Sequence, residues 1–183
     1  MNSPYEGKFK VTQQYKPGTH DGLDLVGIDS KDIHSCANAT VVYAGWQNPN
    51  DHKEGFGYYV ATEDDVAGSD GVHKIRYYGH LSEINVKYGE HVNITKVIGK
   101  EGCTGYVIPD GPSGAHCHYE IRSAFYKGAK VYDVSADSGI PNVEGGIYDD
   151  GYRPKNDQPA EKKTMKVTVE YDDHHFSGLL EEQ

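Results

Sequence analysis

Short runs in which hydrophobic and polar residues alternate dominate this chain. Such runs lie at 9–13, 24–28, 39–46, 56–62, 72–78 and 114–122. Alternation with a period of about two residues is typical of half-buried β-strands. No window shows a long helical period. The pattern therefore predicts an all-β, turn-rich fold, which the 22 Gly and 15 Tyr among 183 residues also favour.

The C-terminal part of the chain has a different pattern. Residues 142–163 are rich in Gly, Asp, Lys and Pro, which is typical of a linker. Two apolar runs then flank Asp172-Asp173-His174-His175, which predicts a β-hairpin with both histidines in its turn. We therefore expect a domain over 1–141, a linker over 142–163 and a hairpin appendage over 164–183. A lone hairpin is marginal in water, so this one should pack on another surface or pair with another chain.

Charge and composition exclude some classes of protein. The net charge of −10, with acidic residues spread throughout, argues against a nucleic-acid-binding surface. No apolar run approaches the roughly 20 residues of a transmembrane helix. The first residues also lack the apolar segment of a signal peptide. We therefore expect a protein that is made in the cytoplasm and has no transmembrane segment.

The three cysteines are Cys36, Cys103 and Cys117. An odd number without a Cys-x-x-Cys spacing fits neither a disulfide framework nor a cysteine-rich zinc site. We expect them to be buried thiols in a protein made in a reducing compartment.

The stretch Gly114-Ala-His-Cys-His-Tyr-Glu-Ile-Arg122 carries the strongest chemical signal. Residues two apart in a strand point to the same face, so His116 and His118 should lie side by side while Cys117 and Tyr119 face the other way. Two imidazoles on one rigid face can serve as metal ligand, general base or both.

A second candidate stretch is His20-Asp21-Gly22-Leu23-Asp24. A histidine and a carboxylate separated by a glycine turn could both reach one metal ion. Asp21 and Asp24 are rival ligands, and we favour Asp24 because it opens a strand and so has a more fixed direction. The alternative is a solvated turn, in which both aspartates are turn residues.

Four other histidines divide into two groups. His80 lies at the end of the strand predicted over 72–78, where a side chain can be held over a cleft. His52, His73 and His91 lie in polar surroundings, and we expect them to be solvated.

Taken together, the motifs are His20-x-Gly-x-Asp24, Tyr78-x-His80-Leu81, Gly99-x-x-Gly-x-Thr104-Gly105 and His116-x-His118-Tyr-Glu. The order of these motifs and the residues in them resemble those of the lysostaphin/LytM-type zinc metallopeptidases over about residues 18–125. The resemblance implies a compact antiparallel β-sheet or sandwich domain with a groove. It also implies cleavage of short peptide segments of bacterial peptidoglycan, often at bonds that contain glycine.

The resemblance also assigns roles to individual residues. His20, Asp24 and His118 match the three ligands of one zinc ion, and His80 and His116 match two catalytic histidines that do not bind it. Two histidines and one carboxylate leave a fourth tetrahedral position open, as a hydrolytic zinc site requires. We expect His116 to be the general base and His80 to stabilise the oxyanion or assist proton transfer, although these two roles could be reversed.

Three features depart from the family pattern, and one is Tyr58, where the usual Gly-aromatic-Gly-Asn run ends in Asn. Members usually have Leu between the two histidines and Phe after them, whereas this chain has Cys117 and Tyr119. Both should lie on the face away from the metal, so we expect altered packing and unaltered chemistry. The loop 106–113 is longer than usual and carries two prolines, so we expect it to form a wall of the groove.

The sequence therefore predicts a zinc-dependent endopeptidase that acts on peptidoglycan peptides in the cell wall, with release as a phage or prophage lysin as one route there. The alternative is a catalytically inactive wall-binding or regulatory member, which the complete set of ligands disfavours. A biotinyl- or lipoyl-type carrier domain is a weaker alternative, because no modifiable lysine occupies a hairpin tip and the histidines would be unexplained. The oligomeric state is left open.

Overall fold

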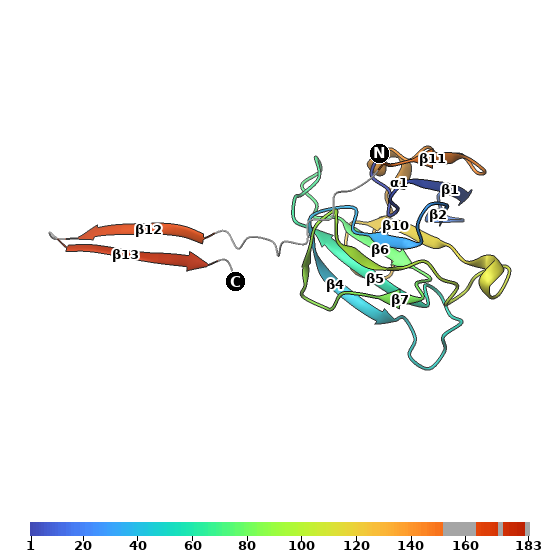
Figure 1. Ribbon diagram of the computed structural model, residues 1–183, viewed down its shortest axis with the longest axis horizontal. Helices are drawn as coiled ribbons and strands as arrows, with labels where there is room; N and C mark the ends of the chain where they lie inside the picture. The colour runs from blue at the N-terminus through green and yellow to red at the C-terminus, as the bar shows by residue number, and fades with distance from the viewer. Residues whose placement is uncertain (152–163, 172–173, 182–183) are drawn as a thin grey trace.

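The computed structural model describes residues 1–151, 164–171 and 174–181, and the regular secondary structure in this part of the chain is almost entirely β-strand (Figure 1). Its main element is an antiparallel eight-stranded sheet with the order β11-β1-β2-β10-β6-β5-β4-β8. Its strands are β1 (Lys8–Gln13), β2 (Gly22–Gly27), β4 (Ala39–Trp46), β5 (Tyr58–Asp64), β6 (Ile75–Gly79), β8 (His91–Val92), β10 (Cys117–Arg122) and β11 (Ile147–Asp149). The predicted all-β, antiparallel fold is confirmed.

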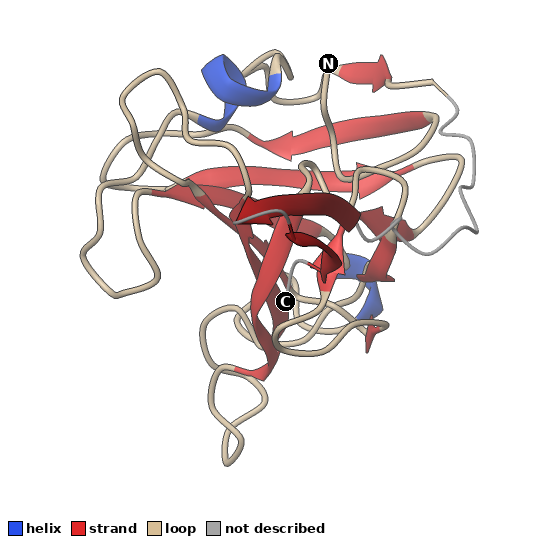
Figure 2. Ribbon diagram, turned by 90° about the vertical axis from the view of Figure 1, so that its left-hand side faces the viewer, coloured by secondary structure: helices blue, strands red, loops and turns tan. Residues whose placement is uncertain are grey.

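A smaller sheet and two short helical turns complete the domain. The three-stranded sheet has the order β3-β9-β7, with β3 at Asp32–His34, β7 at Glu83–Ile84 and β9 at Val97–Lys100. The 3-10 turn η1 spans Pro112–Gly114, and the helix α1 spans Val134–Ser138. Figure 2 shows how little of the fold these helical turns occupy beside the strands. No helix in the described part of the chain is long and apolar enough to span a membrane.

The main hydrophobic core takes side chains from both sheets. The buried faces of β2, β6 and β10 contribute aromatic and aliphatic groups, and Ile33 and Ile98 come from the smaller sheet. Cys36 and Cys117 are buried, as expected, whereas Cys103 is partly exposed, and none of the three forms a disulfide within the described residues. The core therefore fixes one face of β10, and its other face is left for the site.

Strand register places the candidate residues. His118 on β10 lies opposite Asp24 on β2 and opposite Gly79 on β6. His80 follows Gly79 directly and accordingly lies next to the same point on the sheet. The central strands β2, β10 and β6 thus bring together motifs that lie up to 98 residues apart in the sequence.

Two predictions about the C-terminal part need correction. Residues 147–149 were expected to be linker, but they form β11, which pairs with β1 through Lys8, Phe9 and Lys10. β11 is a short edge strand and its Ile147 is exposed, so it has no apolar alternation to reveal it. The predicted hairpin is present as β12 (Thr164–Tyr171) and β13 (His174–Glu181), yet His174 and His175 lie in β13 and not in the turn. Residues 152–163 lie outside the described part.

Candidate metal centre

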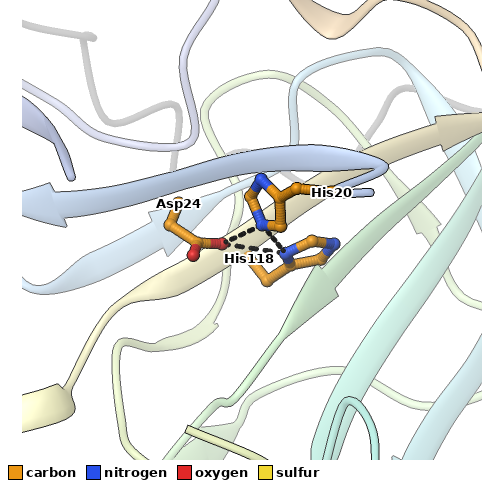
Figure 3. A group of neighbouring side chains, drawn as sticks. All are labelled: His20, Asp24 and His118. Carbon is orange, nitrogen blue, oxygen red and sulfur yellow. Dashed lines mark hydrogen bonds and ion pairs between the residues drawn. The ribbon is translucent and has the colours of Figure 1, made fainter. Parts of the chain in front are cut away.

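Three side chains converge on one point at the surface of the large sheet (Figure 3). Asp24 Oδ1 lies 3.0 Å from His20 Nε2 and 2.8 Å from His118 Nδ1. The two histidine nitrogens lie 3.2 Å from each other. His20, Asp24 and His118 are the group of described residues whose ligand atoms could hold one metal ion.

The hydrogen bonds behind the two histidines show which ring nitrogens face the centre. His20 Nδ1 lies 2.9 Å from the carbonyl oxygen of Gln14, and His118 Nε2 lies 3.2 Å from a carboxylate oxygen of Glu120. Both partners are acceptors, so with a metal ion in the centre that nitrogen of each neutral ring is the donor and the other nitrogen presents a lone pair to the centre. Without a metal ion, a proton on the other nitrogen is donated to Asp24 Oδ1. Such outer partners are typical of metal-binding histidines.

This donor set fits a zinc ion. Zn–N and Zn–O distances of about 2.0–2.2 Å in tetrahedral geometry separate neighbouring ligand atoms by about 3.3 Å. The separations of 2.8–3.2 Å between His20, Asp24 and His118 are close to that value. Two lone pairs and a carboxylate facing one another also repel unless a cation lies between them, so the arrangement favours a bound positive charge.

The pKa shifts of Asp24 and His118 also favour a positive charge in the centre. Burial raises the pKa of Asp24, but hydrogen bonds from His118 and His20 outweigh it and hold the pKa well below its ordinary value. Burial likewise lowers the pKa of His118, but hydrogen bonds to Asp24 and Glu120 raise it to about 9. The buried carboxylates thus make the centre attractive to a proton or a metal ion.

Gly22 is required here for space and not for an unusual backbone angle. A Cβ atom at this position would lie 2.6 Å from the carbonyl oxygen of Tyr119 and 2.8 Å from the His118 ring. The absence of a side chain therefore lets β2 approach β10 closely enough for Asp24 to reach His118. Asp21, the rival carboxylate, is partly exposed and does not belong to the ligand group.

The two other predicted histidines, His80 and His116, stand beside this centre. Their ring centroids are 4.6 Å apart, and His116 Nε2 lies 3.6 Å from Asp24 Oδ1. His80 Nδ1 lies 2.7 Å from the carbonyl oxygen of Thr104, and His116 Nδ1 lies 2.7 Å from that of Gly114. Each neutral ring therefore donates from Nδ1 and presents the lone pair of Nε2.

The backbone around His80 is unusual. Its φ angle is 62°, the only positive value for a non-glycine residue in the described part of the chain. Its N–H donates to the carbonyl of Phe56, while Thr104 Oγ1 donates to the carbonyl of Leu81. These bonds hold the strained residue, a feature that clusters at functional sites. Burial and the neighbouring rings of His116 and His118 lower the pKa of His80 to about 3, so it is neutral near pH 7.

A groove of about 530 Å³ opens over these side chains. All five predicted site residues line it, together with Gln13, Thr19, Gln47, Gly55, Phe56, Tyr106, Val107 and Ile108. Tyr106 and Ile108 are exposed and come from the loop that was predicted to form a wall, and this prediction is confirmed.

Sequence reasoning missed the supporting role of Glu120. Its side chain is 2% exposed and links His118 to the Nε atom of Arg122. The signal was available, because Glu120 and Arg122 follow His118 at intervals of two and so share its face of β10. His52, His73 and His91 are exposed, as predicted, and lie outside the lining of the groove.

Comparisons with known proteins identify the relatives of this chain. The sequence profile of Peptidase family M23 matches residues 18–132. The glycyl-glycine endopeptidase ALE-1 of Staphylococcus capitis is 31% identical over 103 residues, which are 56% of this chain and 24% of the relative. Lysostaphin of Staphylococcus staphylolyticus is 30% identical over 103 residues, 56% of this chain and 18% of the relative.

Among solved structures, the catalytic domain of lysostaphin from Staphylococcus simulans aligns with a TM-score of 0.54 and 25% identity. The alignment covers 73% of this chain and 92% of that domain. The chain thus spans about a fifth to a quarter of the curated relatives it matches, and nearly all of the solved catalytic domain.

Proposed function

Because this chain belongs to Peptidase family M23, we propose that it is a zinc-dependent endopeptidase that hydrolyses peptide bonds in bacterial peptidoglycan. The observation that carries the proposal is the convergence of His20 Nε2, Asp24 Oδ1 and His118 Nδ1 in a groove that also holds two further imidazoles. The names of the relatives, a glycyl-glycine endopeptidase and lysostaphin, favour a peptide of the stem or the cross-bridge as substrate.

In this proposal His20, Asp24 and His118 hold one zinc ion. Bound zinc supplies Lewis acidity, which polarises the scissile carbonyl and lowers the pKa of water. Glu120 holds the His118 ring so that Nδ1 would be available to the ion, and the carbonyl of Gln14 does the same for Nε2 of His20. The ligand set is complete, which supports an active peptidase over an inactive wall-binding or regulatory member of the family.

The proton chemistry falls to His116 and His80. His116 takes a proton from the attacking water at Nε2 and returns it to the leaving amine, with the carbonyl of Gly114 fixing the ring. His80 stays neutral because its pKa is about 3, and its Nδ1–H is committed to Thr104. It therefore accepts a hydrogen bond at Nε2 and orients the water. This geometry favours assistance to proton transfer over stabilisation of the oxyanion, the other role expected for His80.

The test is amine release from peptidoglycans of distinct cross-bridge chemistry, with and without a zinc chelator. We expect release that the chelator blocks and that zinc restores, and no release by His118→Ala. Mass spectrometry of the fragments then identifies the bond. Stoichiometric binding to walls without release from any of them would support the inactive wall-binding alternative instead. The route to the wall, expected to be release as a phage or prophage lysin, stays a prediction.

A further inference from the structure

The face of the large sheet that carries His118 continues into a cluster of aromatic rings. We define this aromatic shelf as Tyr43, Phe56, Tyr59, Tyr77 and Phe125. Neighbouring ring centroids in it are 4.5–6.2 Å apart, and a hollow of about 380 Å³ lies against four of these rings. The shelf is therefore a second depression on the face that holds the metal centre.

The shelf is continuous with the groove. Phe56 and Gln47 line both depressions, and the Phe56 ring lies 5.5 Å from the His118 ring. Tyr77 on β6 lies opposite Glu120 on β10, two residues beyond His118. A peptide bound at the metal centre and extended along β10 would consequently pass over the shelf.

Arg122 lies within this hollow. Its guanidinium carbon is 5.2 Å from the centroid of Tyr77 and 5.9 Å from that of Phe56, and its side chain is 16% exposed. Among the hydrogen bonds that Arg122 could make to residues 1–151, the only one present joins its Nε to Glu120. The two terminal nitrogens make no hydrogen bond to any residue between 1 and 151, and Lys127 lines the same hollow.

The Arg122 guanidinium is held in place by the Phe56 and Tyr77 rings and by Glu120, and both of its terminal NH₂ groups are available. Such a group is suited to bind the carboxylate of a ligand. Arginine binds carboxylates through paired N–H donors, and a preorganised fork loses less entropy on binding. The chain as a whole carries a charge of −10, so it offers no general attraction to acidic ligands. Arg122 and Lys127 accordingly place two positive charges at one hollow of an acidic protein.

We propose that Arg122 and the aromatic shelf form a subsite that binds a carboxylate of the peptide substrate at a distance from the scissile bond. Arg122 is four residues from His118 along β10, which corresponds to about 13 Å or about four residues of an extended peptide. The subsite would make the enzyme prefer peptides that carry an acidic group in that region. This inference rests on the proposed function, because it deepens the specificity of the same groove.

The test uses pairs of synthetic peptides that are identical except for a carboxylate or a carboxamide three to five residues from the cleaved bond. We expect the wild-type kcat/KM to favour the carboxylate peptide by roughly tenfold or more, through KM, as for a hydrogen bond to a charged group. Arg122→Gln should abolish this ratio and Arg122→Lys should restore part of it. Lys87→Gln, which removes an exposed positive charge outside both depressions, should keep the wild-type ratio.

Three results would overturn the inference. One is a wild-type ratio near one at every tested position, and another is a ratio that Arg122→Gln leaves intact. A third is an equal loss of kcat on both peptides with the ratio preserved, because Arg122 would then only support Glu120. If neither peptide is cleaved, the proposed function fails and calorimetric binding of the same peptides decides: an Arg122-dependent preference for the carboxylate supports the subsite, and equal binding refutes it.

Discussion

Gly22→Ala should disrupt the metal centre although residue 22 is not a ligand. The added methyl group would lie 2.6 Å from the Tyr119 carbonyl oxygen and 2.8 Å from both Cε1 and Nε2 of His118. Carbon atoms in proteins rarely approach this closely, since optimal contacts are at about 3.5–4.0 Å. The contact can be relieved only if β2 moves away from β10 or the His118 ring turns.

The effect of either movement on stability and on zinc affinity can be estimated from the distances. Relieving the contact requires a displacement of roughly 1 Å, the difference between 2.6–2.8 Å and about 3.5–4.0 Å. The His118 ring is hydrogen-bonded to both Asp24 and Glu120, so such a movement lengthens at least one bond to the ring. Overpacking of this kind costs about 1–3 kcal/mol of folding free energy. We expect zinc affinity to fall by about 10–100-fold, as when an outer partner of a metal ligand is lost.

The assay is competition for zinc against a chromophoric chelator, together with urea unfolding of the same samples. Gly68→Ala is the matched control, because its Cβ would meet only the ends of the Asp70 and Lys74 side chains. We expect the control to bind zinc like the wild type. Wild-type zinc affinity in Gly22→Ala, with unchanged peptidase activity, would refute the argument that Gly22 is required for space.

Four further predictions follow from the site and its surroundings. Glu120→Gln should lower zinc affinity about 10–100-fold in the same competition assay, because it weakens the bond that orients His118; unaltered affinity would contradict this. His116→Ala should lower kcat by about 10²–10⁴-fold while zinc, measured by metal analysis, stays bound; loss of the metal would instead make it a ligand. As pH falls from 6.5 toward 3, the unfolded chain protonates His80 before the folded protein does, so the free energy of unfolding should fall by up to about 1.4 kcal/mol per pH unit. Urea titrations should show a shallower slope for His80→Gln, and an identical slope would refute the assignment. Tyr119→Phe should lower stability by about 1–3 kcal/mol with kcat unchanged, because it removes the buried acceptor of Arg76; a changed kcat would show that this core position reaches the chemistry.

The long strands could be predicted from the sequence because their alternation is strong. The run at 39–46 coincides with β4, and the runs at 56–62 and 72–78 overlap β5 and β6 with ends displaced by one to three residues. β3 and β11 have only three residues each, too few for a periodic signal. α1 has five residues and depends on Asp133, which accepts hydrogen bonds from Ser135 and Ala136 at its N-terminus.

The proximity of the candidate site residues could be predicted because spacing along a strand determines which side chains share a face. His116 and His118 are two apart, and the choice of Asp24 over Asp21 followed from its place on a strand; the structure brings His20, Asp24 and His118 together. The hydrogen-bond partner of each histidine nitrogen could not be predicted. It depends on the carbonyls of Gln14, Thr104 and Gly114, whose positions come from the tertiary fold.

The metal centre and the core lie on opposite faces of β10, so one strand register positions both. Because side chains alternate along β10, a slip of one residue against β2 would turn Cys117 and Tyr119 into the groove and His118 into the core. Tyr119 and Cys117 are fully buried, and the ring of Tyr119 stacks on Tyr78 of the neighbouring strand at 5.4 Å. Cys117 and Tyr119, two of the positions expected to depart from the family pattern, therefore lie on the face that sets the register. They influence the ligands only by keeping β10 in place, so we expect the two differences to alter packing and to leave the geometry of His118 unchanged.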